Sequence, residues 1–208
     1  MKAKNDREIR AYTCDVSTRE DEKHGSILEG IPIVYDVETD IGGMWKEIID
    51  RGALDQADLK DVRFLVNHDM DSIPLARSRN NNENSTMQMM VEEDGLHVRV
   101  DLDTEGNPKA KELYSAVKRE DVSGMSFAFT VKEDAWDDLD SEYPTRHIKS
   151  LGRIFEVSAV TFPAYEQTSI NARSLESGKA SLDSAREALE SARKVEEMRK
   201  AIIERCKK

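Results

Sequence analysis

The sequence predicts an α+β protein with mainly antiparallel strands, one internal helix and a C-terminal amphipathic helix. Two strand-like runs at 86–91 and 96–102, joined by a turn at 92–95, are typical of a β-hairpin. One internal segment, 108–120, has apolar residues spaced three and four apart, which predicts a helix. Strands and helices do not alternate repeatedly along the chain, so a sheet of the α/β-hydrolase type is disfavoured.

The first quarter of the chain contains predicted strands separated by turns. Segment 1–25 is charged and is expected to be loosely ordered, although 9–16 could form a first strand. A strand with a bulge, or at a sheet edge, is predicted at 26–36, where Gly and Pro interrupt a β-branched run. Another strand is predicted at 45–49, and 51–54 is expected to begin a turn and a short helix.

An apolar strand at 63–66 is predicted to end at a polar corner formed by Asn67, His68 and Asp69. A histidine at the end of a buried strand can present its ring to a cleft. The alternative is a partly exposed histidine that is hydrogen-bonded within its own turn. An Asn-rich connection at 80–85 then leads into the predicted hairpin.

Ser126 is the candidate nucleophile because it is a small hydroxyl residue inside an apolar run. The residues at 127–131 have strand periodicity, and Gly124 separates them from the preceding helix. We therefore expect Ser126 to be exposed at one edge of a sheet. The order of helix, serine and strand is the reverse of that in the Gly-x-Ser-x-Gly elbow. A structural serine that bonds the backbone at a strand start is the alternative.

The last predicted strand lies within 148–165 and follows an acidic, turn-rich segment at 132–147 that is expected to be a flexible excursion. Alternation places Glu156 and Ser158 on one face of this strand. A glutamate that points the same way as small or apolar residues is costly to bury unless it is paired. Glu156 is therefore a candidate partner for a basic group.

From Ser174 onward the pattern changes to an amphipathic helix with a thin, Ala-rich apolar stripe. So weak a stripe predicts that the helix packs on the body, pairs with another chain or stays partly frayed. A solvated helix without a partner is the alternative. The expected organisation is a loosely ordered segment at 1–25, a main domain at 26–172 and a helical tail at 173–208.

Charge and cysteine content exclude several classes of protein. The formal net charge is −11, and the segment from Asn171 contains ten Lys and Arg against seven Asp and Glu, so residues 1–170 carry −14. An acidic body without a basic aromatic stripe argues against nucleic-acid binding. Cys14 and Cys206 lie far apart and form no cluster of metal ligands, which favours a reducing cytoplasm. Neither a membrane span nor an export leader is expected.

Three motifs in combination resemble the prohead (procapsid maturation) protease family of tailed bacteriophages, over roughly 27–172. They are Phe-Leu-Val-Asn-His-Asp at 64–69, Gly-Met-Ser-Phe-Ala-Phe at 124–129 and Glu-Val-Ser-Ala-Val-Thr-Phe-Pro-Ala at 156–164. That family looks related to the herpesvirus assemblins, which are serine proteases built on a β-barrel wrapped by helices. The resemblance therefore implies a mainly antiparallel β-barrel with flanking helices.

By this resemblance, Ser126 is the nucleophile, His68 is the general base and Glu156 is the acidic residue that orients the histidine. In the assemblins the third member is a histidine, so His97 or His147 is the alternative to Glu156. The resemblance implies no cofactor and no metal.

The same resemblance implies a serine endopeptidase that works inside the prohead, in the host cell cytoplasm. Its substrates would be the scaffold protein, the N-terminal segment of the major capsid protein or both, and also the chain itself. Backbone N–H groups near the nucleophile, or an arginine such as Arg153, would hold the oxyanion. The tail is expected to dock on scaffold or capsid protein, and homo-oligomers are compatible with this picture. The alternative is a non-catalytic capsid or scaffold component that retains a protease-like fold.

Overall fold

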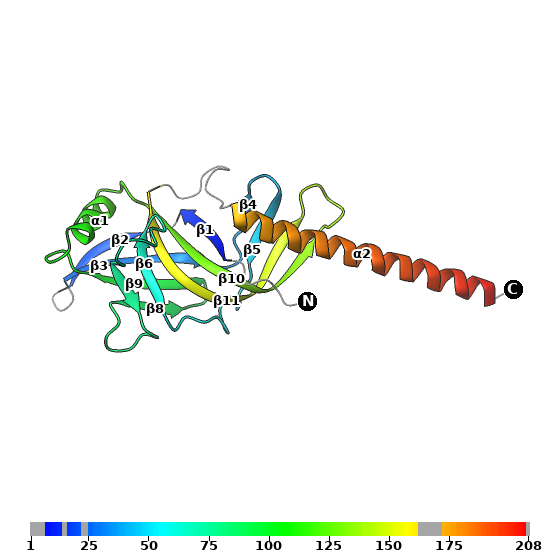
Figure 1. The fold of residues 1–208 in the computed structure, drawn as a ribbon, viewed down its shortest axis with the longest axis horizontal. Helices are drawn as coiled ribbons and strands as arrows, with labels where there is room; N and C mark the ends of the chain where they lie inside the picture. Colours follow the sequence, from blue (N-terminus) through cyan, green and yellow to red (C-terminus); the bar gives the residue numbers. More distant parts are fainter. Residues whose placement is uncertain (1–6, 14–15, 22–24, 162–171, 207–208) are drawn as a thin grey trace.

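The computed structural model describes residues 7–13, 16–21, 25–161 and 172–206 (Figure 1). In chain order the elements are β1 (Glu8–Thr13), β2 (Ser17–Asp21), β3 (Gly25–Val34), β4 (Thr39–Ile41), β5 (Trp45–Ile49), β6 (Val62–Val66), β7 (Ala76–Ser78), β8 (Met87–Val91), β9 (Gly95–Leu102), α1 (Pro108–Lys118), β10 (Gly124–Asp137), β11 (Thr145–Val160) and α2 (Ala172–Cys206). Most of these elements are strands, which confirms the predicted α+β class. Within the described ranges, no helix is long and apolar enough to cross a membrane.

The long strand β11 organises the larger of two sheets. Seven strands form this sheet in the order β1-β10-β11-β5-β4, with β6 paired to β11 and β7 paired to β6. Along its length β11 runs antiparallel to β10. Its first part, 145–148, pairs in parallel with β5, and its last part, 156–159, pairs in parallel with β6. The start and the end of β11 therefore have different neighbouring strands, β5 and β6.

The smaller sheet contains four antiparallel strands in the order β2-β3-β9-β8. The pairing of β3 with β9 shifts between Gly30 and Ile33, which confirms the bulge predicted in this segment. Val98 of the smaller sheet shares one hydrophobic core with Phe127 and Val157 of the larger sheet. Strand pairing among the described residues gives two sheets, and no closed barrel is detected in them.

Helix α1 confirms the helix predicted at 108–120, and its start is set by local chemistry. The side chain of Asn107 accepts a hydrogen bond from the backbone N–H of Lys109 at 3.0 Å, which caps one of the unpaired donors of the first turn. Pro108 fills the first turn, where its missing N–H costs nothing. The buried face of the helix consists of Ala110, Leu113 and Val117.

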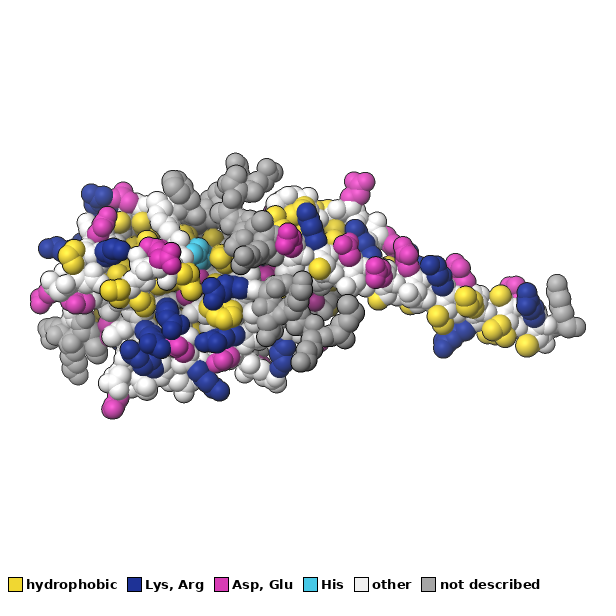
Figure 2. Space-filling model, viewed as in Figure 1, with side chains coloured by type: hydrophobic (Ala, Val, Ile, Leu, Met, Phe, Trp, Pro, Cys, Tyr) yellow, Lys and Arg dark blue, Asp and Glu magenta, His cyan; other side chains and the backbone are white. Residues whose placement is uncertain are grey.

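Helix α2 begins against the body and ends in solvent, as Figure 1 shows. Gly178 allows a close approach, because a Cβ atom at this position would lie 2.5 Å from Cζ2 of Trp45. Leu182 is also buried against the body. Farther along, Val195 and Met198 are 50% and 66% exposed, and hydrophobic side chains are visible along this part of the helix in Figure 2.

Three expectations about polar segments are wrong. Segment 132–147 is not a flexible excursion, because β10 continues to Asp137 and β11 starts at Thr145, and their backbones pair with each other while β5 pairs with the other edge of β11. Most of its acidic side chains are exposed, whereas Arg146 is buried in ion pairs with carboxylates of other strands, so composition alone hid the strands. In segment 1–25, β1 confirms the first strand predicted within 9–16, but β2 forms where a loose segment was expected, and part of the segment lies outside the described residues. Residues 51–54 form turns and no helix.

Candidate active site

Ser126 lies inside β10, with β1 on one side and β11 on the other. Its neighbours in register are Ala11 of β1 and Ser158 of β11. The residue is fully buried, and its hydroxyl donates a hydrogen bond to the backbone carbonyl of Arg10 at 2.7 Å. The expectation that Ser126 is exposed at a sheet edge is therefore wrong, because β1 forms the edge beyond it.

His68 lies in a tight corner directly after β6. Asn67 and His68 both have left-handed backbone conformations, with φ of 51° and 59°, which cost residues other than glycine about 1–2 kcal/mol each. The side chain of Asn67 offsets this cost by bonding to Thr161 just beyond β11. Its Oδ1 accepts the Thr161 N–H at 2.9 Å, and its Nδ2 donates to Thr161 Oγ1 at 3.0 Å. These bonds fix where His68 leaves the sheet.

Glu156 is the partner that the structure gives to His68. Its Oε1 lies 2.7 Å from Nδ1 of the histidine, and the carboxylate side chain is only 1% exposed while the imidazole is 23% exposed. The other carboxylate oxygen, Oε2, accepts the hydroxyl of Ser158 at 2.5 Å. A buried carboxylate with two hydrogen-bond partners is the compensated arrangement that burial of this group requires.

Ser158 is a site residue that reasoning from the sequence missed. Its Oγ accepts the backbone N–H of His68 at 3.1 Å while its own hydroxyl donates to Glu156. It therefore links the carboxylate to the main chain of the histidine. The signal was present in the sequence, since Ser158 follows Glu156 by two residues and so shares its face of the strand.

The hydrogen bond to Glu156 determines what the His68 ring can do. When Nδ1–H donates to the carboxylate, the neutral ring carries its lone pair on Nε2, which can then accept a proton. Ser126 is opposite Ser158 in the β10–β11 pairing, which brings the Cβ atoms of directly opposed residues to about 4.5–5.5 Å. Among the described residues, however, no hydrogen bond joins Ser126 to His68, and the Ser126 hydroxyl is bonded to β1.

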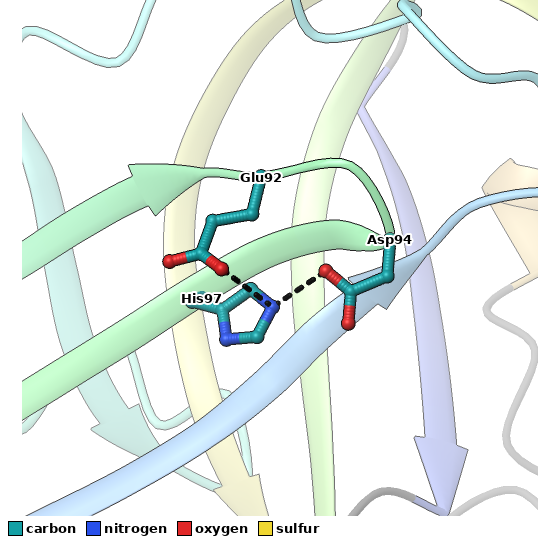
Figure 3. A group of neighbouring side chains, drawn as sticks. All are labelled: Glu92, Asp94 and His97. Carbon is teal, nitrogen blue, oxygen red and sulfur yellow. Dashed lines mark hydrogen bonds and ion pairs between the residues drawn. The ribbon is translucent and has the colours of Figure 1, made fainter.

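His97 and His147, the two alternatives to Glu156 as the third catalytic residue, have other partners. Figure 3 shows His97 at the β8–β9 hairpin, where its Nε2 lies 2.7 Å from Asp94 Oδ1 and 3.8 Å from Glu92 Oε2. His147 pairs with Asp50 at 2.8 Å near the start of β11. Eleven residues of extended strand, about 36 Å, separate His147 from the position opposite the candidate nucleophile.

The structure also places one group of potential metal ligands and the side chain of Arg153. Within the described ranges, Glu92, Asp94 and His97 form the one group whose metal-ligand atoms all lie within 4.8 Å of one another, and the two carboxylates are exposed. Arg153, the candidate oxyanion group, has its guanidinium 5.1 Å from the centre of the Phe155 ring. Within the described ranges, no hydrogen bond joins Arg153 to Ser126.

A histidine held by a buried carboxylate, next to a strand that carries a serine, is the kind of arrangement that serine peptidases use. The model of the caudovirus prohead serine protease family matches residues 13–181, and the chain belongs to this family. It is therefore a member of a family of peptidases involved in phage capsid maturation.

Two individual proteins resemble the chain. The prohead protease of Enterobacteria phage HK97 is 33% identical over 162 residues, which span 76% of this chain but only 64% of that protein. The solved structure of the bacteriophage T4 capsid assembly protease, gp21, is 14% identical with a TM-score of 0.38, and the match covers 74% of this chain and 98% of that one.

Proposed function

We propose that this chain is a serine endopeptidase of capsid maturation in which Ser126 is the nucleophile, His68 the general base and Glu156 the group that orients the base. The observation that carries the proposal is the 2.7 Å contact between His68 Nδ1 and the buried carboxylate of Glu156. Family membership supports peptide-bond hydrolysis as the reaction.

In the proposed mechanism, Nε2 of neutral His68 takes the hydroxyl proton of Ser126 as Oγ attacks the substrate carbonyl carbon. The resulting imidazolium is stabilised by Glu156, which remains ionised, and then gives its proton to the leaving amine. Water then hydrolyses the acyl-enzyme with the same base. Backbone N–H groups near Ser126 would hold the oxyanion.

The hydrogen bond from Ser126 to the Arg10 carbonyl must break before this reaction can begin. The hydroxyl can leave that carbonyl by rotation about χ1, or β1 can move away from β10. We infer that the described arrangement holds the hydroxyl away from the base, and that the catalytic form differs from it locally.

The proposed substrates are the scaffold protein, the N-terminal segment of the major capsid protein, or both, and the chain itself. The reaction would take place inside the prohead in the host cytoplasm.

The distal part of α2, with Val195, Met198 and Ile202 at least half exposed, would dock on scaffold or capsid protein. The double variant Met198→Ser and Ile202→Ser should then abolish incorporation into proheads while leaving peptide cleavage unchanged. Normal incorporation of this variant would remove the docking proposal.

The second candidate function is a non-catalytic capsid or scaffold component with a protease-like fold. It is favoured by one observation, namely that the Ser126 hydroxyl is buried and occupied by β1. The two functions differ in whether any peptide bond is cut.

Mass spectrometry of the purified chain, incubated alone and with the capsid protein's N-terminal segment, separates them. The wild type should produce defined fragments of itself or of the segment, and Ser126→Ala should produce none. Ser150→Ala, a serine replacement on β11 away from the candidate site, is the matched control and should cut as the wild type does. Equal fragmentation by Ser126→Ala would reject the nucleophile, and an uncut wild-type sample would favour the non-catalytic function.

A further inference from the structure

A cavity of about 400 Å³ lies beside the candidate active site. It is bounded by α1, by the ends of β6 and β11 and by the loop that enters β10. Its wall is mainly apolar and includes Leu65, Leu75, Leu113 and Val122, and Ile73 contributes to its lining with a side chain that is 84% exposed. A cavity of this size and lining is typical of sites that bind small molecules or side chains.

The cavity and the candidate active site share residues. Asn67 and Thr161, whose side chains are bonded to each other and fix the corner that carries His68, also line the cavity. Asn67 directly precedes His68, so the cavity wall begins about 3.8 Å along the chain from the candidate base. An extended peptide advances by about 3.3 Å per residue, so a chain whose scissile bond lies at His68 and Ser126 passes the cavity within two or three residues.

Two of the three charged residues that line the cavity, Asp69 and Lys109, are joined through Ser72, and the third, Glu112, is exposed to solvent on α1. The ammonium group of Lys109 donates to Ser72 Oγ at 3.1 Å, and the Ser72 N–H donates to Asp69 Oδ1 at 3.2 Å. The hydroxyl of Ser72 also bonds the Asp69 carboxylate, which lowers the pKa of Asp69 below its ordinary value. A mainly apolar wall, with its charged groups engaged through Ser72 or exposed to solvent, favours an uncharged, apolar occupant.

We propose that this cavity is a specificity pocket that takes one large aliphatic side chain, such as Leu, Ile or Met, of the substrate within three residues of the scissile bond. Ile73 covers that side chain from the solvent side. The proposal rests on the proposed peptidase function and deepens it by naming the class of peptide that the site selects.

The test begins with cleavage of a mixture of peptides by the wild-type chain and identification of the cut sites by mass spectrometry. One position within three residues of the cuts should be enriched in Leu, Ile or Met. A synthetic pair that differs only by Leu or Ala at that position should then differ at least about tenfold in kcat/KM, the usual range for apolar pockets.

Two variants address the pocket itself. Ala116→Phe fills the cavity from α1, and Ile73→Ser removes the apolar cover at a position that is exposed enough to leave the fold intact. Both should reduce the Leu to Ala ratio toward one. Val91→Ser removes an apolar residue on β8 that is also exposed, at 44%, and should leave the ratio unchanged. A wild type without aliphatic preference, or a ratio that neither variant changes, overturns the proposal.

A binding measurement separates this proposal from the peptidase function. Ser126→Ala, titrated with the Leu and Ala peptides by calorimetry, should bind the Leu peptide more tightly, and adding Ile73→Ser should remove that difference. If this binding difference is found but the wild type cuts no peptide, the pocket stands and the hydrolytic function fails. If neither cleavage nor preferential binding is observed, both proposals are rejected.

Discussion

A buried carboxylate lies at each end of β11, Glu156 on β11 itself and Glu47 on the neighbouring β5, and the two sites differ in the cationic side chain that contacts the carboxylate. At the end paired with β6, Glu156 contacts His68, whose ring is 23% exposed. At the end paired with β5, Glu47 on β5 contacts two arginines, Arg10 of β1 and Arg146 of β11, and all three side chains are at most 2% exposed.

This difference separates a site that can react from one that supports the fold. A histidine changes its charge near neutral pH and keeps one ring nitrogen free, so its pairing with a carboxylate can transfer protons. An arginine does not lose its proton in a protein, so a carboxylate between two guanidinium groups only holds strands together. The Arg10–Glu47–Arg146 cluster joins β1, β5 and β11, and Glu8 adds a second carboxylate to it.

The largest expected effect comes from Glu156→Gln. A glutamine can donate to His68 Nδ1 and favour the wrong tautomer, so kcat/KM for peptide cleavage should fall roughly 10³–10⁴-fold. Circular dichroism should still report a folded chain, because the amide retains a bond to Ser158. Activity within tenfold of the wild type would remove Glu156 from the proposed mechanism.

The corresponding change at the other end, Glu47→Gln, should lower stability rather than activity. Removing one partner of a buried ion pair leaves guanidinium charge uncompensated and costs about 3–5 kcal/mol. Urea denaturation measures that loss, and kcat/KM per folded molecule should stay within a few-fold of the wild type. A drop in kcat/KM as large as that of Glu156→Gln would show that the two ends are not functionally distinct.

Acid should weaken the Arg10–Glu47–Arg146 cluster in a defined direction. Burial alone would raise the pKa of Glu47, but ion pairs and hydrogen bonds with Arg10 and then Arg146 outweigh it, so the pKa lies below its ordinary value of 4.5. A depressed pKa contributes stability that is complete above the ordinary value and is lost as pH falls through the folded-state value. The free energy of unfolding should therefore fall below about pH 4.5, and less steeply in Glu47→Gln. Parallel pH curves for the two proteins would contradict this origin.

The smallest expected effect concerns the corner that holds His68. Asn67→Gly keeps the left-handed backbone at little strain but loses the bonds to Thr161, whereas Asn67→Ala loses the same bonds in a backbone conformation that costs alanine about 1–2 kcal/mol more than glycine. The alanine variant should therefore be the less stable of the two in urea denaturation. Equal stabilities would show that the backbone conformation of this corner costs nothing.

Much of the fold could be predicted because the relevant signals are local. The strand at 45–49, the hairpin of β8 and β9 and the helix at 108–120 follow from periodicity and turn residues, and the structure confirms them. The two candidate residues His68 and Glu156 were placed at or beside apolar strands, and they lie in contact.

The features that the sequence did not reveal depend on contacts between residues that are far apart along the chain. A first strand could be anticipated at 9–16, but its place in the sheet could not, because the partner of Arg10 lies 37 residues away and a partner of Glu8 lies 138 residues away. With β1 unplaced, the burial of Ser126 could not be foreseen. The role of Ser158 was missed for a related reason, since its hydroxyl acts through the main chain of His68, which is 90 residues away.

Covalent labelling with a fluorophosphonate, mapped by peptide mass spectrometry, tests the central claim most directly, because such a reagent reacts with a serine that a neighbouring base activates. The account predicts a single adduct on Ser126 in the wild type, no adduct in Ser126→Ala and much slower labelling in Glu156→Gln. An adduct on another serine, or labelling of Ser126 at an equal rate in Glu156→Gln, would contradict the claim that His68 and Glu156 activate Ser126.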